Sequence, residues 1–317
     1  MSSPQPSKSD IIRTLCDSWI AAAVPMGGVL TIGAETEQFR LLRDGIVFHE
    51  LNYDELRSTC VGLARVLLQP GLNTMIDLDH RVLWSWCADV ILLHRPALLA
   101  PGEREIGDLF RLCIRAAIAN ARRPPASQKE WDDSVAESNK IPYHMRELAN
   151  EAYAILAYLS FPLLEAVVKR ACSSVVDPAG HVLRDFTVTS RSGRPRDYQA
   201  GKICSSLRDL LYLHHDQFAS PTLKVSLDEC IANLRRLDST REPYDLIFEW
   251  RNSALHGSAS LPTVGGTLVT LAILILLDGR EANYEEVRSE TLKRIQFDLR
   301  TSGGPPRKSP WGFYLPI

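Results

Sequence analysis

The sequence lacks a long uninterrupted hydrophobic run. Its most apolar segment, TLVTLAILILL at residues 267–277, has eleven residues, whereas a membrane-spanning helix needs about twenty. The first ten residues, MSSPQPSKSD, are polar and contain no signal-peptide pattern. We therefore expect a cytoplasmic protein with no membrane partner, in which residues 267–277 form a helix buried in the core.

A cysteine pattern typical of disulfides is also missing. The seven cysteines are widely spaced and odd in number, and no two of them form a CxxC pair. Several lie in apolar, helix-like surroundings, which favours reduced, buried thiols over a disulfide framework.

The chain has no excess of charge and no common cofactor motif. Its formal net charge is −2 at pH 7, so a nucleic acid would have to be held by a local basic patch. The segment GGVLTIGAE at residues 27–35 has neither the GK[ST] of a phosphate-binding loop nor the GxGxxG spacing of a dinucleotide site. No Ser-His-Asp or Cys-His arrangement stands out. We expect no cofactor.

Helical periodicity is present along most of the chain. Asn52 can cap a helix whose apolar residues recur at helical spacing until Pro70 and Gly71 stop it. Residues 144–173 predict one long helix or two, because Pro162 interrupts the pattern. The predicted fold class is therefore mainly α.

Two segments depart from the helical pattern. Residues 27–51 contain β-branched residues and a turn signal at Asp44-Gly45, which predicts a short β-hairpin. Residues 177–201 are rich in turn-forming and basic residues, which indicates a second short excursion into β structure.

A change in composition suggests two domains. Residues 123–142 are polar, charged and proline-bearing, which is typical of a linker. They would separate a smaller, mostly helical regulatory or recognition domain (1–122) from an antiparallel helical bundle (143–300). Residues 301–317 read as an extended C-terminal tail.

The candidate catalytic residues are Arg251, Asn252 and His256, in the stretch EWRNSALHGSAS at 249–260. On a helix, the arginine and the histidine would lie about 140° apart around the axis and about 7.5 Å along it. One copy therefore cannot bring both onto one phosphate, but two facing copies could. An imidazole near neutrality can exchange a proton with a ribose 2′-hydroxyl, and a guanidinium can stabilise a phosphate whose charge grows in the transition state.

The segment RNSALHG resembles the Arg-(four to six residues)-His motif of HEPN domains (higher eukaryotes and prokaryotes nucleotide-binding). A long helix ending in PLLEAVVKR before the motif and a very apolar helix after it are similar to that family too. The resemblance covers roughly residues 143–300. It implies a metal-independent endoribonuclease, usually a homodimer whose two motifs form a composite site.

That resemblance also implies roles for the three residues and a biological setting. His256 would act as general base or acid, Arg251 would stabilise the pentacoordinate phosphorane, and Asn252 would position the RNA. Cleavage would leave a 2′,3′-cyclic phosphate and a 5′-hydroxyl. Members are often prokaryotic toxins or antiviral defence proteins, so a regulatory protein or antitoxin is another implied partner. The chain itself holds no nucleotidyltransferase-like GS…D signature of the kind found in small partners of some such toxins.

Two other interpretations remain open at this stage. A non-catalytic HEPN-like module would bind nucleotide, RNA or a protein partner, with Arg251 and His256 as charges at a solvated helix end. A metal-dependent hydrolase would use His214, His215 and Asp216. Because adjacent histidines on a helix point about 100° apart, we expect no metal site there.

A basic loop is the candidate RNA-binding surface. Its positive side chains could follow an RNA backbone, although a solubilising loop has the same composition. The candidate residues are Arg191, Arg194, Arg196 and Lys202.

Overall fold

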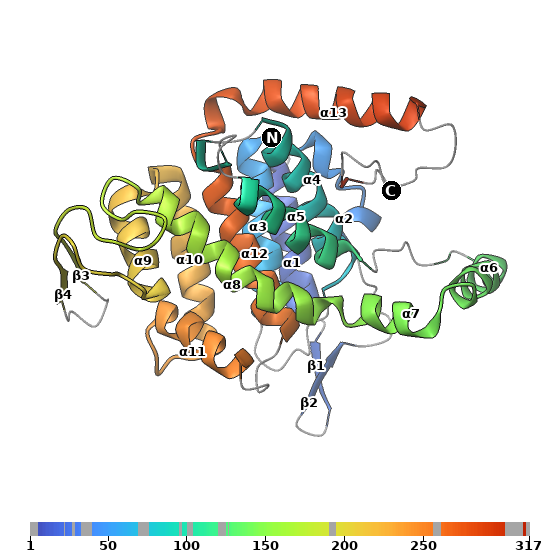
Figure 1. The fold of residues 1–317 in the computed structure, drawn as a ribbon. Coiled ribbons are helices and arrows are strands. Elements are labelled where there is room, and N and C mark those ends of the chain that lie inside the picture. Colours follow the sequence, from blue (N-terminus) through green and yellow to red (C-terminus); the bar gives the residue numbers. More distant parts are fainter. Residues whose placement is uncertain are drawn as a thin grey trace, which may run out of the picture.

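The protein is mainly α-helical, with two small antiparallel hairpins (Figure 1). The computed structural model describes residues 6–21, 23–26, 29–32, 40–68, 76–94, 97–99, 104–119, 125, 127–189, 195–255, 261–301 and 313–314. The α-helices are α1 (Lys8–Ala21), α2 (Arg40–Arg43), α3 (Tyr53–Leu67), α4 (Leu78–His94), α5 (Arg104–Ile118), α6 (Gln128–Asn139), α7 (Tyr143–Asn150), α8 (Ala152–Ala171), α9 (Leu207–Leu213), α10 (Pro221–Leu237), α11 (Pro243–Leu255), α12 (Leu261–Leu277) and α13 (Tyr284–Thr301). The strands are β1 (Ala23–Met26), β2 (Val29–Ile32), β3 (Phe186–Thr189) and β4 (Pro195–Tyr198).

Helix α12 lies at the centre of the bundle. Every residue from Thr263 to Leu277 is buried, and α3, α4, α8 and α10 pack around it. In Figure 1 it runs behind α8 through the middle of the molecule. This arrangement confirms the prediction that the most apolar segment forms a core helix.

Two adjacent glycines allow α12 to approach its neighbours closely. A Cβ on Gly265 would stand 2.9 Å from the backbone nitrogen of Ala157 in α8. A Cβ on Gly266 would stand 2.5 Å from Leu67 Cδ1 in α3 and 3.1 Å from Trp84 in α4. Any larger residue would push these helices apart, so the glycines set the helix spacing in the core.

Helix α8 continues through Pro162 without a break. The interruption in the long helical segment comes earlier, at Glu151, where α7 ends and α8 begins. Length and composition alone would allow α8 to cross a membrane. A buried core helix has the same properties, and α8 packs against α5 and α12.

The first hairpin lies before the position that the sequence predicted. Strand β1 pairs with β2, so the turn does not fall at Asp44-Gly45. That dipeptide instead follows α2, where Gly45 has a φ of +82°. The end of a helix and the turn of a hairpin both use a residue in the left-handed conformation, so the Asp-Gly dipeptide fits either of them. The second excursion is confirmed, because β3 pairs with β4.

The two predicted domains share one hydrophobic core. Trp84 Nε1, in the N-terminal half, donates to Thr270 Oγ1 in α12 at 3.2 Å, and the Tyr53 hydroxyl donates to the Leu277 carbonyl at 3.0 Å. The predicted linker, 123–142, contains helix α6 and leads into α7. The change in composition therefore marks a segment outside the core and does not divide the core in two.

The cysteines and part of the C-terminal segment belong to this core. All seven cysteines are free and buried, and burial raises the pKa of the Cys16 thiol to about 12. Of the predicted tail 301–317, the structure describes Thr301, at the end of α13, and two further residues. The backbone N–H groups of Phe313 and Tyr314 donate to the buried carboxylate of Asp89 at 2.8 and 2.7 Å.

Candidate functional site

Helix α11 positions the first two residues of the motif. Pro243 begins the helix, and the buried side chains of Tyr244 and Ile247 fix one face of it in the core. In its last turns Arg251 is partly exposed, with 40% of its side chain accessible, and Asn252 is exposed. His256 lies outside the described residues.

Two residues of α8 lie beside Arg251. Glu165 Oε2 is 3.6 Å from the Arg251 guanidinium, and Glu165 Oε1 is 2.7 Å from Lys169 Nζ. One carboxylate is therefore shared by two cations, which leaves this group with a net positive charge at neutral pH. The partly exposed arginine keeps further N–H donors that a phosphate oxygen could use.

The sequence contained a signal for this second pair. Glu165 and Lys169 stand at i and i+4 in PLLEAVVKR, a spacing that places them on the same side of a helix. Only the packing of α11 near α8 shows that Arg251 joins them. The three residues Glu165, Lys169 and Arg251 are called the cation cluster below.

A set of polar contacts fixes the first turns of α11. Arg208 donates to Asp245 at 2.9 Å and lies over the ring of Phe248. The Tyr212 hydroxyl donates to Glu242 at 3.2 Å. These contacts tie α11 to α9, so the position of Arg251 rests on a fixed scaffold.

The candidate RNA-binding residues do not share one environment. Arg191 and Arg194 lie outside the described residues. Arg196 donates to the buried carboxylate of Asp209 at 2.7 Å, and Tyr198 donates to the same carboxylate at 2.5 Å. Arg196 therefore helps to hold β4 on α9, whereas Lys202 is exposed to solvent.

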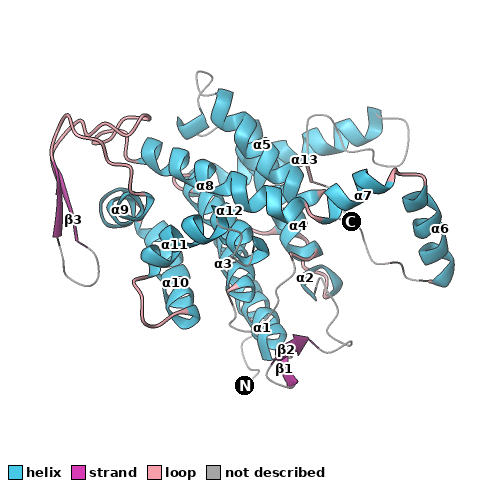
Figure 2. Cartoon of the chain, turned by 60° about the horizontal axis from the view of Figure 1, so that its bottom comes forward, coloured by secondary structure: helices cyan, strands magenta, loops and turns pink. Residues whose placement is uncertain are grey.

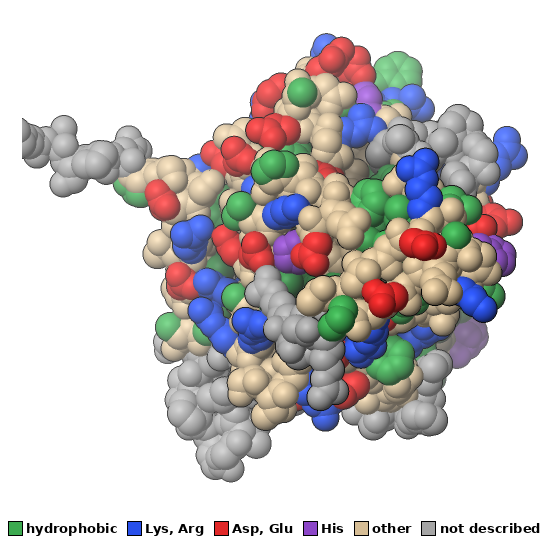
Figure 3. Space-filling view, turned by 90° about the vertical axis from the view of Figure 1, so that its left-hand side faces the viewer, with side chains coloured by type: hydrophobic (Ala, Val, Ile, Leu, Met, Phe, Trp, Pro, Cys, Tyr) green, Lys and Arg blue, Asp and Glu red, His purple; other side chains and the backbone are tan. Residues whose placement is uncertain are grey.

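Charges of both signs cover the face that carries the β3–β4 hairpin and helices α9 to α11. Figure 3 shows this face with Lys and Arg interspersed among Asp and Glu. Across the part of it that the structure describes, no single large basic surface is visible. An RNA would have to be bound by a few local cations, as the small net charge already indicated.

The histidine pair does not form a metal site within the described residues. His214 and His215 are both buried in a π-helical turn at the end of α9. Burial lowers the pKa of His214 to about 4, and His215 Nδ1 lies 3.3 Å from the Tyr244 hydroxyl. No group of three potential ligands is found in the described part of the chain, and Asp216 is exposed.

A second buried polar cluster lies at the start of α4. His80 Nδ1 is 2.5 Å from Asp77 Oδ1 and Nε2 is 3.1 Å from the Leu63 carbonyl. Asp79 accepts N–H groups from Leu41 and Leu42 at the start of α2. Burial raises the pKa of Asp79 to about 7. The cluster therefore joins α2, α3 and α4. The spacing of Asp77 and His80 allows their contact, whereas no local pattern indicates the contacts with α2 and α3.

The geometry offers one surface with chemistry suited to a phosphate, which is the cation cluster with Asn252 beside it on α11. No family model, curated protein or solved structure matches this chain.

Proposed function

We propose that this protein is a metal-independent endoribonuclease of HEPN type. The observation that supports the proposal most directly is the position of Arg251 and Asn252. Both lie at the protein surface near the end of α11, and Lys169 lies across Glu165 from the arginine. A partly exposed guanidinium beside a second cation suits a phosphodiester that gains charge during cleavage. Such an activity would serve a toxin or an antiviral defence effector.

The chemistry assigns one step to each side chain. The ribose 2′-oxygen attacks the phosphorus and gives its proton to one His256 imidazole. The 5′-oxygen leaves and takes a proton from a second imidazole, which leaves a 2′,3′-cyclic phosphate and a 5′-hydroxyl. Arg251 stabilises the phosphorane between these steps, and Asn252 orients a phosphate oxygen or a hydroxyl.

Two copies of the chain are needed for this arrangement. On a helix that continued from α11 as far as the motif histidine, the arginine and the histidine would diverge by about 140°. A facing copy would supply the histidine that one chain cannot place beside its own arginine. We therefore expect the active form to be a homodimer.

The ion pair between Arg251 and Glu165 favours a second candidate function. A guanidinium that is already neutralised by a carboxylate can serve to fix α11 on α8 without any catalytic role. In that case the domain would be a non-catalytic HEPN-like module that binds nucleotide, RNA or a protein partner.

Incubation of the purified protein with end-labelled RNA in excess EDTA separates these functions. The nuclease requires cleavage under EDTA, products with cyclic phosphate ends, and loss of at least about a hundredfold in rate for His256→Ala and Arg251→Ala. His181→Ala and Arg235→Ala are matched controls, because both side chains are exposed and lie outside the motif. RNA that stays intact but is retained by the protein supports the binding module. Equal cleavage by the wild type and His256→Ala rejects the nuclease.

A further inference from the structure

Exposed large hydrophobic side chains are concentrated in one short segment. The described residues contain seventeen of them, and nine lie between residues 131 and 158. They are Trp131, Val135, Ile141, Tyr143, Met145, Leu148, Tyr153, Ile155 and Tyr158. Exposed apolar side chains that gather in one region of a protein commonly mark an interaction site.

The first part of this segment projects from the bundle as an arm. Residues 127–150, called the arm below, contain α6 and α7, and neither helix has a buried residue. Figure 1 shows α6 at the far end of the arm, away from the core. Isolated helices shorter than about 12–15 residues are only marginally stable in water. The arm therefore has the properties of an element that packs against a partner.

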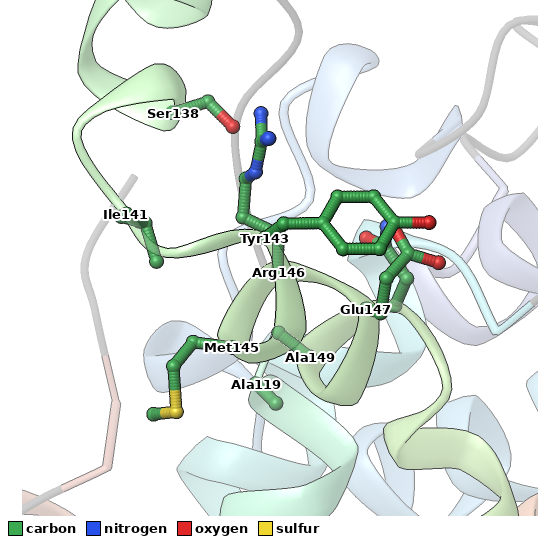
Figure 4. Close-up of a pocket in the computed structure, with 9 residues that line it drawn as sticks. Ala119, Ser138, Ile141, Tyr143, Met145, Arg146, Glu147 and Ala149 are labelled. Atoms are coloured by element: carbon green, nitrogen blue, oxygen red, sulfur yellow. The ribbon is translucent and has the colours of Figure 1, made fainter.

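A cleft on the arm provides room for that partner. It measures about 510 Å³ and is lined by residues of the arm together with Ala119, at the end of α5. Figure 4 shows Met145 beside Ala119 and the guanidinium of Arg146 extending toward Ser138 at the end of α6. The cleft thus combines apolar side chains with one cation, Arg146, and one carboxylate, Glu147.

The opposite end of α8 carries complementary features. The loop around its C-terminal end exposes two apolar side chains, Leu183 and Ile203, and two cations, Arg184 and Lys202. A hydrogen bond from Val182 N to the Lys202 carbonyl, 2.8 Å long, holds the two parts of this loop together. These four exposed residues are called the landing surface below.

Charge also differs between the two ends of α8. Residues 127–151 carry six Asp or Glu and three Lys or Arg, whereas the described residues within 169–204 carry five Lys or Arg and three Asp. Figures 1 and 2 both place α6 and the β3–β4 hairpin at opposite ends of the molecule. One end therefore carries an excess of acidic residues beside exposed apolar side chains, and the other carries a small excess of basic residues beside two exposed apolar side chains.

We propose that two copies of this chain associate through a two-fold axis with their α8 helices antiparallel, so that the arm of each copy docks on the landing surface of the other. In a two-fold interface the same two surfaces of each copy take part, so the arm of the first copy meets the landing surface of the second and the reverse contact forms as well. Antiparallel helices place opposite ends side by side. The chain carries complementary charge and exposed apolar side chains at these two ends, which favours a second copy over an unrelated partner.

The outer face of α8 connects the arm with the cation cluster. Along this face the residues facing solvent are apolar at Ile155, Tyr158 and Pro162 and charged at Glu165. An axis near Pro162 would set the two Glu165 residues about 9 Å apart along the helices and bring the two Arg251 side chains to the same region. The meeting of the two Arg251 side chains rests on the proposed function, whereas the association of the two copies does not require RNA cleavage.

Sedimentation equilibrium of the full chain tests the association directly. We expect a dimer for the wild type at micromolar concentrations. Leu148→Glu should weaken the association roughly tenfold or more, because it places a charge in an apolar contact. Val225→Glu is the matched control and should not change it, since Val225 is 57% exposed on α10 and Leu148 is 52% exposed on the arm. Far-UV circular dichroism checks that each variant is folded.

A charge exchange tests the pairing of the arm with the landing surface. Arg184→Glu combined with Lys202→Glu should weaken the dimer, and the further changes Asp132→Lys and Asp133→Lys should restore it. Carbodiimide cross-linking of mixed ¹⁴N and ¹⁵N protein should join Lys202 to a carboxylate of α6 in mixed-isotope peptides.

Three results would overturn the inference. They are a monomeric wild type at tens of micromolar, an equal effect of Leu148→Glu and Val225→Glu, and a charge exchange that restores nothing. The RNA assay is read separately. A dimer that behaves as expected but leaves RNA intact overturns the nuclease alone. A monomer that cleaves RNA overturns the interface and the two-copy active site, but not the nuclease activity itself.

Discussion

A single methyl group at Gly265 tests how closely the two central helices approach. Gly265→Ala would place a Cβ 2.9 Å from the backbone nitrogen of Ala157 and 3.0 Å from its Cα. Favourable non-bonded contacts begin near 3.5 Å, so the helices would have to separate by roughly 0.6 Å. The obstacle is the backbone of α8, which cannot rotate away as a side chain can.

The expected magnitude follows from two opposing effects. Alanine is more favourable than glycine inside a helix by about 1 kcal/mol. Overpacking of a close-packed core costs about 1–3 kcal/mol. We therefore expect Gly265→Ala to lower the free energy of unfolding by about 1 kcal/mol.

Gly107→Ala in α5 is the matched control. A Cβ there would meet only the end of the flexible Arg111 side chain, at 3.5 Å, so the helix propensity should act alone and raise stability by about 0.5–1 kcal/mol. Urea unfolding followed by circular dichroism measures both values. If Gly265→Ala were as stabilising as Gly107→Ala, the close approach of α8 and α12 would be wrong.

Three further predictions concern titratable and charged residues. Burial raises the pKa of Asp89 to about 7. Between about pH 4 and 7 the folded protein therefore keeps a proton that the unfolded chain releases, so the free energy of unfolding should fall as pH rises through this range. Urea titrations should show a smaller fall for Asp89→Asn than for the wild type. Burial lowers the pKa of His214 to about 4, so the free energy of unfolding should fall as pH drops from about 6.5 to 4. His214→Phe should remove this loss, and it should raise the free energy of unfolding at pH 7 by about 1 kcal/mol, because it eliminates an Nδ1 that is buried without a hydrogen bond. A variant less stable than the wild type at both pH 7 and pH 4 would contradict this. Arg196→Ala should lower thermal stability by breaking the bond to Asp209 while changing RNA affinity little. An unchanged melting temperature together with weaker RNA binding in a filter-binding assay would return Arg196 to the RNA surface.

Local signals in the sequence predicted many individual elements correctly. Asn52 caps α3 as expected, and the structure adds Glu55 as the second member of a capping box. Pro243, a residue type suited to a first helical turn, begins α11. These signals work because a cap or a first-turn proline acts on backbone groups within a few residues. The Asp44-Gly45 signal failed for the same reason. It specifies a left-handed residue, and only the neighbouring chain decides whether that residue ends a helix or turns a hairpin.

The candidate site could be predicted only in part. The motif letters identified Arg251 and Asn252 as candidates, and the structure places both near the end of α11 at the surface. The pairing of Arg251 with Glu165 joins residues 86 positions apart, and no local pattern encodes such a contact. Arg196 shows the same limit, because its buried partner Asp209 could not be distinguished in the sequence from a solvated acid.

The order of residues by itself determined that the chain is helical, that residues 267–277 lie in the core, and that its thiols are buried. The periodicity and the apolar content of the sequence predict these features, because each feature depends on the burial of one face of a helix or of a whole helix. The tertiary structure alone decided that both halves share one core, that an acidic arm stands apart from it, and that Glu165 lies between two cations. These features depend on which surfaces meet, and that choice is made by the packing of the whole chain.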